Sequence, residues 1–106
     1  MSAEDKRGVR IAQQFREPNN MTYELDCAGS PLIVRIFPGE APSADWRVEA
    51  RLSDAADAVV ASASAASRAQ AFEGVAHWWR DNGAAQALPA LDWEAIAKAM
   101  TAVRAL

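Results

Sequence analysis

The chain has only one cysteine and one histidine among its 106 residues, and it has no long hydrophobic run. A lone cysteine cannot form an intramolecular disulfide, and one residue of each kind cannot complete the usual nitrogen and sulfur ligand set of zinc. No stretch approaches the ~20 apolar residues of a membrane span, and residues 1–15 lack the apolar segment of a secretion signal. We therefore expect a cytoplasmic protein with no metal site and no membrane partner.

Motifs for common catalytic and cofactor chemistry are also missing. The five glycines are scattered along the chain, so none of them builds a loop that could cradle a phosphate. The sequence contains no nucleophile elbow, no zinc-protease helix and no Walker motif. We expect no bound cofactor, and the sequence nominates no complete set of catalytic groups.

Charge and size limit the class of protein. The net charge of −3 argues against a strongly basic nucleic-acid-binding protein, although nine of the eleven basic residues are arginine. Alanine accounts for 25 residues, so the four tryptophans must supply much of the buried apolar surface. The length suits one domain over residues 1–106, and we expect residues 1–6, which are polar, to be disordered.

Four segments of the first half, residues 8–16, 21–27, 32–37 and 46–53, have the composition or alternation of strands. In the first, Val9, Ile11 and Phe15 share one face, interrupted by Gln13, and Arg10, Ala12, Gln14 and Arg16 share the other. Residues 32–37 are apolar except for Arg35, which is typical of a central strand covered on both faces. Turn signals at residues 18–20, 28–31 and 38–43 separate the strands.

The second half has helical spacing. A capping box formed by Ser67 and Gln70 predicts a helix over residues 68–82, and Asp92 caps a second helix. The apolar stripe of the first helix contains Ala69, Phe72, Ala76 and Trp79, and that of the second contains Trp93, Ile96, Ala97, Met100 and Val103. Residues 58–64 could be a fifth strand or the beginning of the first helix, and the capping box favours the strand.

This order of elements predicts an α+β fold. We expect a curved antiparallel sheet of four or five strands, followed by two C-terminal helices that pack on one of its faces. The other face of the sheet then faces outward.

His77 and Cys27 are the candidate chemical groups. Glu73 and Asp81 lie four residues before and after His77, which would suit a general base, but nothing nearby supplies a nucleophile. Cys27 falls on the same strand face as Leu25, so we interpret it as a buried apolar residue. An enzyme built on His77 is the least favoured function.

The outward sheet face collects Arg10, Arg16, Arg35, Arg47 and Arg51, against Glu24, Asp26 and Glu49. Arg10, Arg35, Arg47 and Arg51, together with Phe37, could follow the phosphates of a single-stranded nucleic acid and stack a base. The competing interpretation is ion pairing, with Arg10 or Arg16 beside Glu24 or Asp26, and with Arg47 or Arg51 around Glu49.

Trp78 points about 100° away from the neighbouring Trp79 on the predicted helix. It either widens the buried face of that helix or covers an apolar patch used for dimerisation or for a partner. Our leading hypothesis is a small, cytoplasmic, non-enzymatic protein-interaction domain that binds itself, as a homodimer, or an unknown protein. The alternative is single-stranded nucleic-acid binding on the arginine-bearing sheet face.

Overall fold

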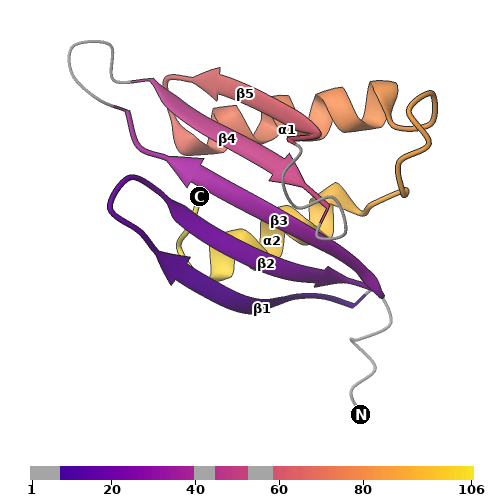
Figure 1. Ribbon diagram of the computed structural model, residues 1–106, viewed down its shortest axis with the longest axis horizontal. Coiled ribbons are helices and arrows are strands. Elements are labelled where there is room, and N and C mark those ends of the chain that lie inside the picture. Colours follow the sequence, from indigo (N-terminus) through magenta and orange to yellow (C-terminus); the bar gives the residue numbers. More distant parts are fainter. Residues whose placement is uncertain (1–7, 40–44, 53–58) are drawn as a thin grey trace.

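The computed structural model describes residues 8–39, 45–52 and 59–106. The elements are β1 (Val9–Arg16), β2 (Met21–Cys27), β3 (Ser30–Phe37), β4 (Trp46–Arg51), β5 (Ala61–Ala65), α1 (Arg68–Asn82) and α2 (Trp93–Ala102). The strands form one antiparallel sheet in chain order, and both helices lie on the same face of it (Figure 1). The predicted α+β fold is confirmed, and the ambiguous segment before α1 is a fifth strand.

Three predictions fall wholly or partly outside the described residues. They are the disorder of residues 1–6, the end of the fourth strand at residue 53, and most of the loop over residues 38–43. Neither helix among the described residues is long and apolar enough to cross a bilayer.

The buried core lies between the sheet and the two helices. The strand residues of β2 and β4 alternate as predicted and those of β3 alternate as well, so that the inward-facing, buried side chains are Tyr23, Leu25, Cys27, Leu32, Val34, Ile36, Val48 and Ala50. Trp93 packs its ring 5.6 Å from that of Phe72 and 5.5 Å from that of Trp79. The buried stripe of α1 includes Ala71 rather than the predicted Ala69, which is exposed.

The predicted caps begin both helices. The side chain of Ser67 accepts a hydrogen bond from the Gln70 amide at 3.2 Å, and Asp92 accepts one from the Ala95 amide at 3.1 Å. Because each bond satisfies an amide that has no partner within its helix, each fixes where the helix starts.

The central strand β3 is covered on one face only, so the prediction that both of its faces are covered is wrong. Leu32, Val34 and Ile36 are buried beneath the helices, whereas Ile33, Arg35 and Phe37 are half-buried on the opposite face. Both helices lie on one side, so among the described residues these three side chains are shielded by their neighbours in the sheet (Figure 1).

A β-bulge in β1 reverses the faces that alternation predicts for the second half of that strand. Ile11 pairs with Leu25 but Gln13 pairs with Glu24, so Ala12 is an extra residue without a partner in β2. Beyond it, Phe15 and Arg16 change sides. Phe15 pairs with Thr22 and is 44% exposed on the outer face, while Arg16 pairs with Met21 on the helix side.

The contact between α1 and β5 depends on small residues. A Cβ atom placed on Gly74 would lie 2.8 Å from the Cβ atom of Ala63, closer than two carbon atoms can approach without a shift. Glycine at this position therefore lets α1 pack directly onto the edge strand.

Replacing Gly74 with alanine should destabilise the fold, because the new methyl group pushes α1 away from β5. The strain of overpacking, about 1–3 kcal/mol, should outweigh the better helix propensity of alanine, about 1 kcal/mol. Urea unfolding measures the change. The matched control is the double variant Gly74→Ala/Ala63→Gly. It removes the Ala63 methyl group that the new Cβ atom would meet, so it should recover much of the lost stability. A more stable Gly74→Ala single variant would contradict this contact.

Candidate functional site

The outer sheet face, meaning the face turned away from both helices, carries most of the predicted arginine set. Arg10, Arg35, Arg47, Arg51 and Phe37 all lie on it. Arg16 does not, because the bulge at Ala12 turns it to the helix side. Phe15, which alternation places on the inner face with Val9 and Ile11, joins the outer face instead. The signal that could have found it is Gln13, a polar residue in the middle of an apolar alternation.

Three of these arginines form ion pairs with carboxylates on the same face. Arg10 Nη2 lies 3.6 Å from Asp26 Oδ2, and Glu49 receives Arg47 Nη2 at 3.5 Å and Arg51 Nη2 at 3.8 Å. The Arg10 pair is exposed and contributes little to stability, whereas Glu49 and Arg51 are largely covered. This geometry favours ion pairing over an open row of cations.

Phe37 is covered by one of the same arginines. The Arg47 guanidinium carbon lies 4.1 Å from the centre of the Phe37 ring, so the two side chains form a cation–π pair. A base could stack on this ring only after Arg47 had moved.

Arg35 differs from the three ion-paired arginines of this face. Its Nε atom is buried and finds no hydrogen-bond partner in the described part of the chain.

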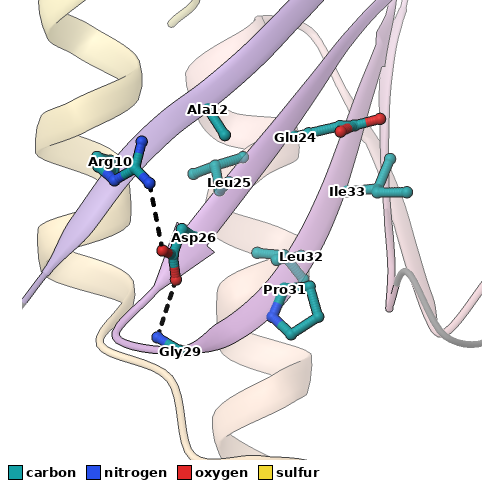
Figure 2. A pocket seen from close by; sticks show the side chains of 9 residues that line it. All are labelled: Arg10, Ala12, Glu24, Leu25, Asp26, Gly29, Pro31, Leu32 and Ile33. Atoms are coloured by element: carbon teal, nitrogen blue, oxygen red, sulfur yellow. Dashed lines mark hydrogen bonds and ion pairs between the residues drawn. The ribbon is translucent and has the colours of Figure 1, made fainter.

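A shallow hollow of about 460 Å³ lies on this face between β1 and β3 (Figure 2). Ala12 leaves space there because its side chain is small, and Arg10 and Glu24 line the rim. Asp26 accepts the Gly29 amide hydrogen at 2.8 Å and pairs with Arg10 (Figure 2). With one arginine against two carboxylates, the hollow has no excess of positive charge to hold a phosphate.

His77 lies on the open surface of α1. Its Nε2 atom is 3.1 Å from Asp81 Oδ2, and the two side chains are 76% and 60% exposed. Among the described residues, no three His, Cys, Asp or Glu side chains gather in a way that could hold a metal ion. The partner of His77 lies four residues away on the same helix. Any two exposed side chains of suitable charge at this spacing can form such a contact, so it does not mark a site.

Cys27 is buried at the end of β2. Burial raises the pKa of its thiol from 9.0 to about 11, and the negative charge of the adjacent Asp26 adds to the rise. A thiol of this kind remains protonated at neutral pH and is a poor nucleophile.

Trp78 is half-buried on α1 and packs against the core cluster. It follows Gly74, the residue in contact with β5, by four positions, so both lie along the same side of the helix. Because α1 runs back along β5, the later residues of the helix lie toward the beginning of that strand (Figure 1). Val59, which is 43% exposed, precedes the strand at that end.

The two edges of the sheet differ in how they are protected. The edge strand β1 carries the bulge and the charged residues Arg10 and Arg16, features that discourage pairing with another strand. The opposite edge strand, β5, has the sequence Ala-Ser-Ala-Ser-Ala and an unbroken register with β4. It has no charge, no proline and no bulge, and no other strand among the described residues pairs with its outer edge.

Comparison of the chain with protein-family models, with curated proteins and with solved structures gave no significant match. Function is therefore inferred from the geometry described above.

The Cys27 thiol should react slowly with DTNB in the folded protein. With a pKa of about 11 in place of 9.0, its thiolate fraction at pH 8 is lower by a factor of about 100, and burial slows attack further. The rate should rise sharply in concentrated urea, which serves as the control. Because the pKa is raised, the thiol contributes stability below pH 9 that is lost as the pH rises toward 11. Equal rates in folded and unfolded protein would contradict the burial of Cys27.

Proposed function

We propose that this chain is a non-enzymatic, cytoplasmic protein-interaction domain that forms a homodimer through the edge of β5. The observation that carries this proposal is the unprotected edge of that strand, which contrasts with the bulged and charged edge of β1. Buried, protonated Cys27 suits the reducing conditions of the cytoplasm.

The sequence of β5 is symmetric about Ala63, which suits pairing with itself. In an antiparallel pair centred there, Ala63 meets Ala63 of the second copy and Ser62 meets Ser64. No like charges face each other, and the serine hydroxyls can hydrogen-bond across the outer face. The two sheets would join into one of ten strands, an isologous dimer with two-fold symmetry.

The position of α1 leaves room for this arrangement. The helix packs against both β4 and β5, so its axis lies about one strand spacing from the proposed two-fold axis. The two copies of α1 would then lie about 10 Å apart, the ordinary distance between packed helices. Trp78 lies on the flank of α1 that faces the second copy, where its exposed part would be buried.

Lysines on the outer face of β5 should break the dimer. In the variant Ser62→Lys/Ser64→Lys, each new lysine faces a lysine of the second copy, and self-association should weaken by about tenfold or more. Sedimentation velocity over a range of concentrations measures the dissociation constant. The matched control is Gln13→Lys/Phe15→Lys, which places the same charges on the outer face of the β1 edge and should leave the dimer unchanged.

Two results would contradict the proposed dimer. One is a wild-type chain that remains monomeric at the highest concentration tested. The other is equal weakening by the β5 and β1 variants, which would show that added charge acts without regard to its place.

Single-stranded nucleic-acid binding is the second candidate, and Phe15 is the observation that favours it. With Phe37 it gives the outer sheet face two aromatic rings in place of the single ring that the sequence predicts. The ion pairs of Arg10, Arg47 and Arg51 count against it, because a phosphate would have to compete with the carboxylates.

A fluorescent single strand of ~20 nucleotides, titrated at low and near-physiological salt, tests this candidate. Because the paired arginines are neutralised, we expect no binding at near-physiological salt. Salt-sensitive binding that prefers single strand to duplex, and that Arg35→Gln weakens, would instead favour the nucleic-acid function over the dimer proposal.

A further inference from the structure

A second cavity, of about 490 Å³, lies at the end of the sheet where β1 ends, β2 begins and α1 begins. Three arginines line it: Arg16 from β1, Arg68 from the first turn of α1, and Arg104 from just beyond α2. We propose that this cavity binds the phosphate group of a small organic phosphate. The site is separate from the proposed β5 dimer contact and does not depend on it.

Uncompensated positive charge is the first reason. The described residues that line the cavity include no carboxylate side chain. None of the ion pairs among the described residues involves Arg16, Arg68 or Arg104. The outer sheet face differs in this respect, because three of its arginines have carboxylate partners. In a chain whose net charge is −3, three unpaired guanidinium groups around one cavity favour an anion strongly.

Each arginine is held in place by a different feature of the fold. The bulge at Ala12 turns Arg16 to the helix side of β1. The guanidinium carbon of Arg68 lies 5.2 Å from the centre of the Trp46 ring, which supports it by a cation–π contact. Arg104 is fixed by the backbone that ends α2.

The backbone at Arg104 is in a conformation that glycine would adopt more easily. Its amide bonds to the Thr101 carbonyl at 2.9 Å, and the Ala105 amide bonds to the Met100 carbonyl at 2.9 Å. These two bonds form a Schellman motif with Arg104 at its left-handed position, at φ 63°. Glycine is the usual residue there, so an arginine at a strained position suggests a role for its side chain.

A buried hydroxyl group lines the same cavity, and α1 begins beside it. Tyr23 is 4% exposed and lines the cavity, and among the described residues its hydroxyl finds one partner, Met21 Sδ at 3.6 Å, a weak acceptor. The first turn of α1 contains no acidic residue, so the positive end of its dipole is not neutralised there.

The donor set and the lining together indicate the class of ligand. Planar guanidinium forks match the oxygens of a phosphate, and a phosphate monoester carries nearly two negative charges where a carboxylate carries one. The cavity is larger than a bare phosphate and falls in the size range of small-ligand sites. Val103, which is 39% exposed, lines it and can contact the organic part.

Isothermal titration calorimetry with phenyl phosphate, inorganic phosphate and benzoate tests the proposal. We expect phenyl phosphate to bind more tightly than inorganic phosphate, because of the apolar lining, and benzoate to bind at least about tenfold more weakly than phenyl phosphate. No binding of phenyl phosphate at millimolar concentration and low salt would overturn the proposal. So would equal affinity for benzoate.

Arg104→Gly is the decisive variant, because it removes the charge while placing the preferred residue at the left-handed position. Its Tm should be unchanged or higher, while its affinity for phenyl phosphate falls at least about tenfold. Arg16→Gln should weaken binding to a similar extent. The matched control is Arg80→Gln, which removes one exposed charge from the last turn of α1 and should leave affinity unchanged.

Two outcomes of this series would overturn the proposal. Equal loss in Arg80→Gln would show that binding follows net charge alone. A single-stranded oligonucleotide that displaces phenyl phosphate and binds far more tightly would assign the cavity to a nucleic acid instead. Neither result depends on whether the chain dimerises through β5.

Discussion

The bulge at Ala12 is the constraint on which both candidate surfaces depend. One extra residue in β1 keeps the strand paired with β2 but exchanges its two faces, so Phe15 moves outward and Arg16 moves to the helix side. The same bulge makes it harder for another strand to pair with the β1 edge. Among the described strands, β5 is then the edge strand that lacks such protection. A single insertion therefore affects the outer face, the basic cavity and the choice of pairing edge.

Small side chains have the corresponding role at the other edge. Alanine and serine are weak strand formers, so β5 is held in the sheet chiefly by its pairing with β4 and by α1 packed on it. Gly74 allows that packing because it places no Cβ atom against Ala63. The run of small residues that brings the helix close also leaves the strand without the charged residues or proline that would keep a second copy away.

The sequence predicts those features of the fold that are local, and it misses those that depend on register or on distant residues. Alternation in β2 and β4 and the caps at Ser67 and Asp92 each involve a few neighbouring residues, and all are observed. The bulge is invisible to alternation except through Gln13. The basic cavity joins positions 16, 68 and 104, which only the packing of α1 and α2 on the sheet brings together.

Arginine content alone did not distinguish the two basic regions of this chain, but pairing does. On the outer face each cation near a carboxylate is already stabilised, and binding a phosphate there would sacrifice an existing ion pair. In the cavity the three guanidinium groups repel one another with no ion pair among the described residues to offset their charge, and Arg104 also holds an unfavourable backbone conformation. Both costs fall on the unliganded molecule, and an anion removes the repulsion. We therefore expect an anionic ligand at the cavity of Arg16, Arg68 and Arg104 rather than on the outer sheet face, where carboxylates already pair with the arginines.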